Sequence, residues 1–547
     1  MPEYLHPGIY VEEVDLGPKS IEGVSTSTAG FVGITERGPI TPTFVSSFTE
    51  YERKFGGYLA DSFMSYAIDG FFRNGGKRCF VGRVIGKNAT ASSLVTSGSN
   101  KLMITANGHG KWGNNVYVKI SKASLSERDP LLFRLDIKYF YNSVSSDLDD
   151  STEAKEETFD NLSSDPKSSD YCVAVVNGAS QFLKIAAFDI GRPSDIETWI
   201  PLKDGTDDGT STRITSRRGS SRTRTDDDSA PTEPEPDTTS TVVSDWEISS
   251  KDFEGYEYQI KDSITNETAS IIRTGLLGFE DIDDISIVVA PNENTISGLR
   301  SALVDHCEKM KERFAILQAN RDDASNIADL YPDRDSKYAG IYMPMINVQD
   351  PLTKSERMIP PGGHIAGVYA KSDVSRGVHK APANEQINGV LSLQVQINKE
   401  QQDILNPRGI NVIRSFPGRG SVIWGARTTS TDPDWKYVNV RRLFLYLEKS
   451  IERSTQWVVF EPNNERLWSR VKATISGFLT EVWQTGALMG TTAEQAFFVK
   501  CDRNTMTQND IDNGRLIVVI GVAPTKPAEF VIFRIAQTKS GTQVEEI

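Results

Sequence analysis

Hydrophobic residues in the segment 283–320 follow two different periods. An apolar run is followed by an amphipathic stretch, and a second apolar run comes after it. Leu299, Leu303 and Met310 keep the spacing of one helical face, and Asn294 is suited to cap the start of that helix. This alternation predicts a strand, a helix and another strand, which together make the βαβ unit of a parallel sheet.

Two longer amphipathic helices are predicted in the segment 436–484. Each has one apolar face with a repeat of three or four residues, made by Val440, Phe444, Leu447 and Ile451 in the first helix and by Leu467, Val471, Ile475, Phe478 and Val482 in the second. The apolar run 456–460 predicts a strand between them, and the runs 514–523 and 529–537 predict two more. Because the last run is almost wholly apolar at its start, its strand is expected to be buried on both faces. The C-terminal region is therefore predicted to be α+β.

A long insertion with a different pattern is predicted at 87–281. Its segments 115–120, 133–140 and 171–176 carry β-branched and aromatic residues between turn signals, which is typical of strands. The stretch Lys203–Asp245 is rich in Ser, Thr, Asp, Arg and Pro and has almost no large apolar residues. Such a stretch cannot bury enough surface to offset its ordering entropy, so it is expected to form an exposed, mobile loop. The insertion is predicted to be a β-rich domain that carries this loop.

Both ends of the sequence carry extended apolar segments. Near the start, Ile9–Val14 is predicted to be extended, and Gly17-Pro18 separates it from the next segment of the chain. Near the end, Phe530–Ile535 is a strand-like run. An unpaired strand exposes a row of N–H and C=O groups that leads to aggregation unless they are paired. Both segments therefore need partners.

Composition narrows the class of protein. The chain has 547 residues, so two to four domains are expected. Its longest apolar run, Leu516–Ala523, is too short to cross a bilayer, so no transmembrane helix or direct membrane insertion is expected. The first ten residues have neither a basic region nor an apolar core of a secretory signal, which favours synthesis and assembly in the cytoplasm. A net charge of −14 argues against a nucleic acid as partner, because phosphate binding needs a surplus of Lys and Arg.

The cysteines and histidines offer no catalytic or metal-binding pattern. The four cysteines lie far apart without a C-x-x-C motif, so they are expected to be reduced and mostly buried, with no chemistry. His6, His109, His306 and His379 are isolated and lack the spacing of zinc-binding motifs. We therefore predict no metal site.

Two motifs are similar to motifs of active sites, but the sequence around each of them does not fit such a site. The sequence GHGKWG at 108–113 fits the dinucleotide fingerprint, but a strand-like segment comes after it instead of a helix, so the glycines are expected to form a turn. The sequence PPGGHIAGVYA at 360–370 is similar to the histidine segment of subtilisin-type proteases. No aspartate ends the preceding strand, and the one Gly-Thr-Ser sequence, 209–211, lies upstream of His364, so the order Asp, His, Ser is absent. No catalytic residue, no cofactor and no enzyme activity are predicted.

Several segments together resemble the tail sheath proteins of contractile phages and of extracellular contractile injection systems. They are YLHPGIYVEEVDLGPKSIEGVSTSTAGFVGITERGP at 4–39, PPGGHIAGVYAKSD at 360–373, WGARTTSTDPDWKYVNVRRLFLYLEKSIERSTQWVVFEPNNERLW at 424–468 and FFVKCDRNTMTQNDIDNGRLIVVIGVAPTKPAEFVIFRI at 497–535. No single one is a short pattern that is prone to chance matches. The insertion at 87–281 carries no such resemblance.

The resemblance implies a structural polymer. Subunits of this family stack as rings of six around an inner tube, assemble on a baseplate under a tail terminator, and contract to drive the tube through a target envelope. The terminal arms of the family are exchanged between neighbouring subunits. Here the arms correspond to Ile9, Tyr10, Val11, Glu12, Glu13 and Val14, and to Phe530, Val531, Ile532, Phe533, Arg534 and Ile535.

The fold class expected from pattern and resemblance is multidomain, α/β plus α+β. The resemblance implies an N-terminal β-arm at 1–20, a subtilisin-like α/β middle domain at 21–86 and 282–385, an inner C-terminal domain at 386–527, and a C-terminal β-arm and tail at 528–547. The β-rich insertion at 87–281, with its loop at 203–245, is expected to be the outermost domain.

The predicted helix at 464–483 offers a candidate contact with the inner tube. Arg466, Arg470 and Lys472 lie beside its apolar stripe and could guide an acidic tube surface. A solvated helix face is the alternative. For the whole protein the alternatives are a non-contractile β-rich shell or adhesin protein and a subtilisin-like hydrolase. The sequence leaves open whether the particle is a phage tail, a bacteriocin or an injection system.

Overall fold

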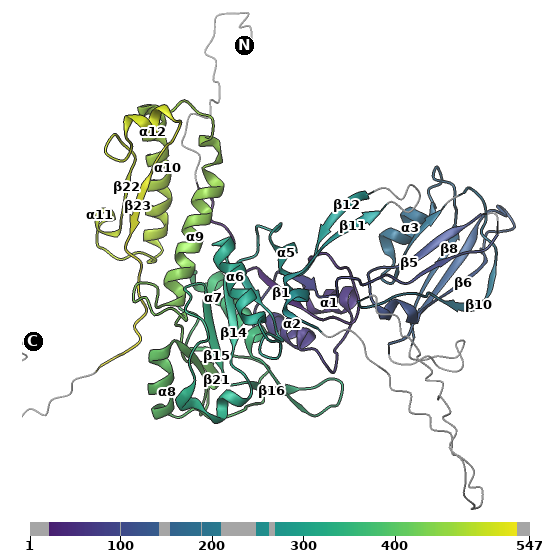
Figure 1. Cartoon of the computed structure of the whole chain (residues 1–547), viewed down its shortest axis with the longest axis horizontal. Helices are drawn as coiled ribbons and strands as arrows, with labels where there is room; N and C mark the ends of the chain where they lie inside the picture. The colour runs from purple at the N-terminus through teal and green to yellow at the C-terminus, as the bar shows by residue number, and fades with distance from the viewer. Residues whose placement is uncertain are drawn as a thin grey trace, which may run out of the picture.

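The computed structural model describes residues 21–98, 100–141, 154–187, 189–208, 248–261 and 268–532. Figure 1 shows three lobes: a central one, an outer one built from the blue strands, and one formed by the green and yellow C-terminal elements. The whole predicted N-terminal arm, Ile9–Val14, lies outside the described residues, and so do Phe533, Arg534 and Ile535 of the C-terminal arm.

A nine-stranded sheet forms the central lobe, with the strand order β18-β21-β20-β15-β14-β13-β1-β3-β2. The six strands from β20 to β3 run parallel, while β2, β21 and β18 at the edges are antiparallel to their neighbours. The strands are β1 Ala29–Gly33, β2 Thr43–Val45, β3 Cys79–Arg83, β13 Ile287–Val289, β14 Phe314–Gln318, β15 Ala339–Met343, β18 Glu385–Gln386, β20 Ile410–Phe416 and β21 Gly420–Ile423. The inner strands are buried on both faces, as parallel strands between helix layers usually are.

Helices cover both faces of this sheet. Successive residues of β1 point to opposite faces. Phe31 stacks edge-on against Phe71 of α2 at 5.4 Å between ring centroids, whereas Gly30 lies directly against Phe279 of α5. One layer therefore contains α2 Met64–Arg73 and α7 Gly362–Arg376, and the other contains α4 Ser250–Glu254, α5 Gly275–Phe279 and α6 Leu299–Met310.

The predicted βαβ unit is confirmed as β13, α6 and β14, with Ile287 paired in parallel to Phe314. The predicted N-cap is wrong. The helix starts at Leu299 after Gly298, whose φ of 81° suits glycine. Asn294 instead donates a hydrogen bond to the carbonyl of Ala319 at 3.2 Å, because the chain makes turns before it enters the helix.

The central lobe continues past residue 385, where its boundary was expected. Strands β20 and β21 complete the main sheet, so residues 410–423 pack with the central lobe and not with the C-terminal one. A small sheet of β16 Ile346–Gln349, β17 Glu356–Ile359 and β19 Ser392–Leu393 and the helix α8 Lys399–Leu405 lie beside it. The helix α1 Phe48–Phe55 packs on α2 and β2.

The outer lobe has two antiparallel sheets around a core of its own. One sheet contains β10 Ile196–Pro201, β6 Val116–Lys122, β7 Phe133–Tyr139 and β8 Lys155–Leu162, and the other contains β4 Ser93–Val95, β5 Leu102–Ala106 and β9 Leu183–Ala187. A two-stranded ribbon of β11 Glu257–Lys261 and β12 Thr268–Arg273 leads back to the central lobe (Figure 1). The strands predicted at 115–120 and 133–140 are confirmed as β6 and β7.

Two expectations for the outer lobe are corrected. The segment 171–176 is not a strand, since Cys172–Ala179 forms the helix α3, which buries Cys172 and Val176 four residues apart against β9. Its β-branched residues fit either structure, and tertiary packing decides. The polar loop starts later than residue 203, because Lys203 and Thr206 bond to Ser93 and Thr90 through their backbones. The rest of the predicted loop, 209–245, lies outside the described residues.

The C-terminal lobe is built from two long helices and a two-stranded sheet. Its elements are α9 Val438–Ser454, α10 Glu465–Gln484, α11 Ala493–Ala496, β22 Phe497–Lys500, α12 Gln508–Asp512 and β23 Val519–Val522. The second predicted helix is confirmed closely: Asn464 caps it, and all five residues of its predicted apolar face are buried. In the first, Val440 and Leu447 are buried and Phe444 and Ile451 half-buried.

The strand predicted at 456–460 is wrong. Gln456–Val458 form a short 3-10 helix, and Phe460 is fully exposed at a φ of 66°. The segment is the turn that lets α10 fold back on α9, so connection geometry overrides its β-propensity. The strand predicted at 514–523 shortens to Val519–Val522. Residues 529–532 form no strand in this chain and are not buried on both faces.

Candidate functional site

The place where an α/β sheet usually binds a ligand is filled by side chains. Strand order reverses between β1 and β13, and such a crevice at the carboxyl ends of strands is the common ligand site. Here the buried Glu293 accepts a 2.6 Å hydrogen bond from the backbone of Gln318, and the amide of Gln318 bonds to Ala290 and Gly362. The side chains of Glu293 and Gln318 thus satisfy backbone groups around them.

The histidine segment that is similar to subtilisin-type proteases forms the start of α7. His364 is buried against Gly70 of α2, and burial lowers its pKa to about 4. His306 is buried beside Arg313 at 2.8 Å, and burial together with that charge lowers its pKa to about 3. These histidines are neutral packing residues. Among the described residues no group of three or more His, Cys, Asp or Glu side chains could hold a metal ion, and no helix could span a membrane.

The described structure places the root of the N-terminal arm, residues 21–27, between the central and C-terminal lobes. Ile21 is buried in the core of the C-terminal lobe, and the backbone N–H of Val24 donates to Ser450 of α9 at 3.2 Å. Gly23 passes so close to Tyr446 that a Cβ there would lie 2.2 Å from its hydroxyl oxygen, so any larger residue would force the Tyr446 side chain to move. These contacts fix where the arm leaves the subunit.

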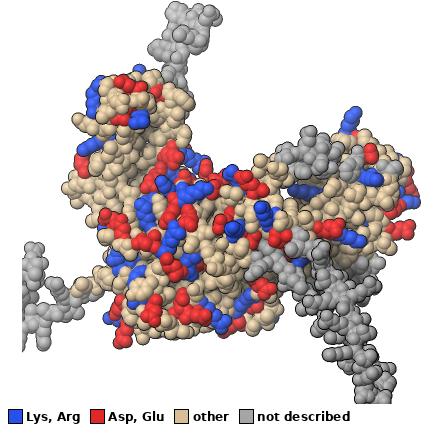
Figure 2. Space-filling view, viewed as in Figure 1, with Lys and Arg blue, Asp and Glu red and all other residues tan. Residues whose placement is uncertain are grey.

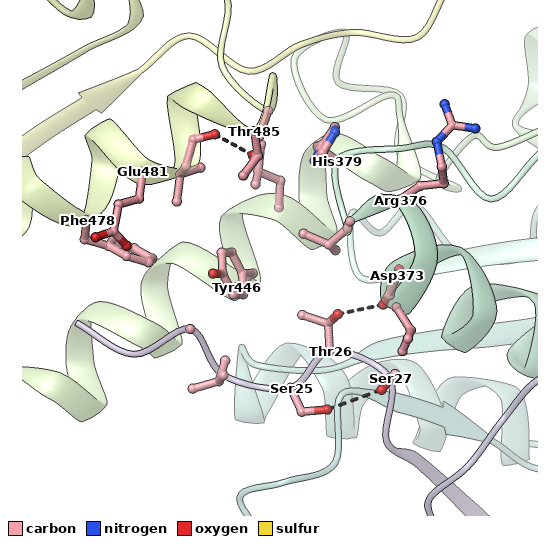
Figure 3. A pocket seen from close by; sticks show the side chains of 18 of the residues that line it. Ser25, Thr26, Ser27, Asp373, Arg376, His379, Tyr446, Phe478, Glu481 and Thr485 are labelled. Atoms are coloured by element: carbon pink, nitrogen blue, oxygen red, sulfur yellow. Dashed lines mark hydrogen bonds between the residues drawn. The ribbon is translucent and has the colours of Figure 1, made fainter. Parts of the chain in front are cut away.

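A buried ion pair holds the lower end of this root. Thr26 donates to Asp373 at the end of α7 at 2.7 Å (Figure 3). Arg442 of α9 grips the same carboxylate with two hydrogen bonds of 2.6 and 2.9 Å and also donates to the carbonyl of Thr26. Both charged side chains are 3% exposed. Removing one partner of a buried pair leaves an uncompensated charge, so the pair strongly fixes the root.

The root of the C-terminal arm, residues 524–529, is held in the same way. Thr525 bonds to Ala487 and Gly486, and its carbonyl accepts from Asn439 of α9 at 3.2 Å. The carboxylate of Glu529 accepts two hydrogen bonds from Arg427, at 2.6 and 2.8 Å, and others from Asn406 and Tyr437. This root therefore lies along the junction of the central and C-terminal lobes.

The pKa of Glu529 reflects this grip. Burial by itself raises the pKa of the carboxyl group, but the hydrogen bonds from Arg427 and Asn406 and the charge of Arg427 outweigh it, so the pKa lies below its ordinary value. Glu529 is ionised at neutral pH and holds the chain by charge-assisted hydrogen bonds.

Beyond Glu529 the chain leaves the molecular surface. Phe530, Val531 and Ile532 are 72%, 68% and 79% exposed, and they belong to no strand. The three described residues of the predicted C-terminal arm are thus apolar and unpartnered in the single chain.

The C-terminal lobe carries a small sheet with open edges. Among the residues that the structure describes, strands β22 and β23 pair only with each other. Phe498 and Val519 in these strands and the nearby Ile517 are exposed. An isolated two-stranded sheet is only marginally stable without further strands or packing. On the face seen in Figure 2, much of the lobe that contains these strands carries few charged side chains, whereas the central lobe carries both signs.

The structure does not bring together the three basic residues that were predicted as a tube contact on the second helix. Arg466 and Arg470 are exposed and lie one turn apart on α10, and Arg470 stacks over Trp457 at 4.3 Å. Lys472 is exposed as well. It lies six residues after Arg466, which places it on the other side of the buried stripe of the helix. The three side chains do not form one patch.

Sequence reasoning missed the residues that hold the two roots, Asp373, Arg442, Arg427 and Glu529. One signal was available: Arg441 and Arg442 lie near the start of a predicted helix, where the helix dipole disfavours cations. Such a placement indicates acidic partners, and Asp373 and Glu448 are those partners.

Comparisons with known proteins show which family of proteins this chain is similar to. Residues 273–429 match the family model of the phage tail sheath protein central domain, and residues 430–538 match that of the phage tail sheath C-terminal domain. The tail sheath protein of Vibrio phage KVP40 is 29% identical over 229 residues, which are 41% of this chain and 32% of that protein. The tail sheath protein of Enterobacteria phage T4 is 26% identical over 290 residues, 51% of this chain and 41% of that protein.

The fold is similar along almost the whole chain to chains in two cryo-EM structures. One is the baseplate of the anti-feeding prophage, with 24% identity, a TM-score of 0.54 and coverage of 98% of this chain and 100% of the other. The second is the sheath complex of an extracellular contractile injection system in the contracted state, with 21% identity, a TM-score of 0.55 and coverage of 98% and 99%.

The two phage proteins are matched over about a third to two fifths of their length, and both matches name the same kind of protein. The two family models meet at residues 429 and 430, just past the end of the central sheet, and together they take in both elements that hold the arm roots, α7 and α9. Family models, curated relatives and fold agree. Residues 273–538 therefore belong to the contractile tail sheath family.

Proposed function

We propose that the protein is the structural subunit of a contractile sheath. It polymerises as stacked six-subunit rings around an inner tube and contracts to drive that tube through a target envelope. The observation that carries this proposal is the pair of arm roots: each is fixed by a buried carboxylate–arginine contact, and the C-terminal one leads directly into exposed apolar residues. A chain end built this way suits a connection to another subunit.

The arms would join subunits by adding strands to a neighbour's sheet. The open edges of β22 and β23 are suitable acceptors, because an added strand satisfies their free backbone groups. Each arm of six residues would make several backbone hydrogen bonds that are worth about 1 kcal/mol each, together with apolar burial at about 25 cal/mol per Å². A lone subunit forgoes this energy, so polymerisation is expected to be cooperative.

Contraction on this proposal is a rotation of rigid subunits within an intact network of arms. The Gly17-Pro18 pair and the chain after Ile535 would serve as hinges. The energy would be stored in the extended lattice at assembly and released when the baseplate changes, so the chain itself would need neither catalysis nor a cofactor. The further partners are the inner tube protein, the baseplate and the tail-terminator proteins.

The finer domain assignments belong to the same proposal. The parallel sheet with helices on both faces supports a subtilisin-like central domain, here with residues up to Ile423 added. The outer lobe would face away from the tube and the C-terminal lobe toward it. On this proposal the protein is assembled in the bacterial cytoplasm. It becomes part of a phage tail or of a released tail-like particle.

The contact with the tube is proposed at α10. Arg466 and Arg470 on one flank of the helix would face an acidic tube surface, with Lys472 contributing separately. Arg470 is partly engaged by Trp457, so Arg466→Glu alone is the cleaner test. Co-assembly with the tube at moderate salt should weaken; unchanged co-assembly would leave α10 as a solvated face.

Deletion of Met1–Leu16 tests the proposed function directly. The variant should be a soluble subunit with unchanged circular dichroism, because residues 21–27 and their contacts remain, but electron microscopy should show no tubes. Full-length sheaths that still contract would overturn arm exchange. Fibres or closed shells from the intact protein would favour the shell or adhesin alternative, and isolated monomers with peptidase activity would favour the hydrolase.

A further inference from the structure

A basic pocket of about 830 Å³ lies under the root of the C-terminal arm, between the end of α7, α8, Trp424 and residues 525–531. Five lysine and arginine side chains line it and only two acidic ones, although the whole chain has a net charge of −14. Glu529, one of the two acids, is already held by Arg427. Four of the five cations have no ion pair among the described residues: Arg376, Lys399, Arg414 and Lys526.

A buried side chain of the same pocket lacks a hydrogen-bond partner. Asn439 is 2% exposed, and its amide nitrogen donates to the carbonyls of His379 and Thr525. Its side-chain oxygen, also buried, accepts no hydrogen bond from any described residue. A buried acceptor without a donor is costly, so this lining is not fully satisfied in the single chain.

The lining also contains apolar residues. They include Trp424, Ala383 and Ala426, together with Phe530 and Val531 of the arm. The pocket therefore suits a short extended peptide that has carboxylates between aliphatic side chains.

We propose that this pocket binds the segment Val544–Ile547 of the same chain while the subunit is unassembled. This segment has the sequence VEEI, two carboxylates between two aliphatic residues. Residues 533–543 connect it to the exposed Ile532, which comes directly after the pocket-lining Val531. A connection of that length spans up to roughly 35 Å when extended, and closing such a short loop costs little beyond the entropy of ordering it.

The fold-back would keep the C-terminal arm on its own subunit until a neighbour's sheet takes it. This second step rests on the proposed function, whereas the binding step does not. The segment Val11–Val14, with the sequence VEEV, has the same pattern, so a neighbour's N-terminal arm is the competing occupant.

Binding is tested with a labelled peptide of residues 540–547 by fluorescence anisotropy. The receptor is the full chain with Glu545→Lys and Glu546→Lys, whose pocket should be empty. The peptide should bind it, bind more weakly as salt rises, and bind at least tenfold more weakly when Lys399→Glu and Arg414→Glu are added. The matched control, Lys77→Glu with Lys87→Glu, reverses two exposed cations elsewhere and should leave binding unchanged. No binding, or equal loss in the control, would overturn the proposal.

A photo-crosslinker at Val544 of the otherwise intact chain identifies the occupant. Crosslinked peptides that join Val544 to the pocket within a single-chain species are expected. The same crosslink found only in dimers, or tighter binding of a 9–16 peptide than of the 540–547 peptide, would assign the pocket to a neighbouring copy instead and overturn the fold-back.

The assembly step has its own readout. If the tail holds back polymerisation, the charge-reversed tail should shorten the lag before tubes form without changing the subunit's melting temperature. Peptide binding with an unchanged lag would retain the pocket assignment and overturn the restraint on assembly. A protein that forms no tubes under any condition would contradict the proposed function, while the anisotropy result would stand.

Discussion

Single buried charges decide where the two ends of this chain leave the molecule. Arg427 and Arg442 are almost fully buried, and each holds one carboxylate, Glu529 and Asp373 respectively. Sequence patterns cannot assign such pairs, because the partners are 102 and 69 residues apart and their burial depends on how two lobes meet. The apolar arms were visible in the sequence, whereas their anchors were not.

Glu529→Gln should loosen the C-terminal root. The substitution leaves Arg427, whose side chain is 7% exposed, without a counter-charge and should lower the free energy of unfolding by about 1–3 kcal/mol. Proteolysis after Phe530 should also become faster. Denaturant unfolding and limited chymotrypsin digestion measure the two effects, and Glu257→Gln, which removes one partner of an exposed ion pair with Arg273, is the control that should change little.

The ion pair of Glu529 with Arg427 should also make the stability of the protein fall at acidic pH. The pKa of Glu529 is lowered in the folded state, so its stabilising effect is complete above an ordinary value of about 4.5 and is lost as pH falls through the folded value. The difference in stability between wild type and Glu529→Gln should shrink as the pH is lowered below 4.5. A constant difference would show that the charge is not what matters.

Three histidines should make the stability of the protein depend on pH over a second, higher range. The pKa values of His364 and His109 are lowered to about 4 and that of His306 to about 3, in each case mainly by burial. The unfolded chain takes up protons near pH 6.5 while the folded chain does not, so stability is complete above pH 6.5 and declines from there toward pH 4. Urea unfolding at several pH values should show this decline, and His364→Gln should reduce its slope.

At the scale of elements, hydrophobic periodicity predicted those elements that the local sequence specifies by itself. The helix α10 begins and ends within a residue of expectation, because a capping Asn464 and an unbroken apolar stripe specify it. The segments 171–176 and 456–460 were predicted as strands because Val, Tyr and Phe favour them, but neighbouring elements force a helix and a turn. Short β-branched runs carry less information than long amphipathic ones.

The C-terminal arm gives a sharp test at this scale. Val531→Pro removes one backbone N–H and fixes φ near −65°, which blocks strand addition. Because Val531 is 68% exposed and in no strand of its own subunit, the melting temperature should stay unchanged while tube formation fails. Val531→Thr should retain both. A marked loss of subunit stability in the proline variant would mean that the arm pairs within its own chain.

At the scale of the whole molecule, the outer lobe is joined firmly to the central one. Glu36 accepts from Arg37 and from Tyr139 of β7, while Arg83 donates to carbonyls of Gly38 and His109. Both Arg37 and Arg83 are buried, so the outer lobe is not a loosely tethered appendage. The composition and strand pattern of the insertion predicted a separate lobe but gave no indication of these contacts, which form between segments far apart along the chain.

The polar loop of the outer lobe should be dispensable only in part. Replacement of 209–247 by a short Gly-Ser linker should preserve folding and tube formation. Extending the deletion to Asp204 should lower the melting temperature, because it removes the pairing of Thr206 with Thr90 and the carboxylates that accept from Lys111 and Asn88. Thermal melts and electron microscopy of the two variants decide; equal stability would show that residues 204–208 contribute nothing.

Both arm roots meet at one turn of α9, where Asn439 holds Thr525 and Arg442 holds Thr26. If the two arms are pulled in opposite directions, this turn offers the shortest path for tension between them, beside the anchors at Arg427 and Asp373. The path is a few residues long in a chain of 547. The mechanical strength of the polymer would then depend on a small number of polar contacts around this turn, while the outer lobe would bear little load.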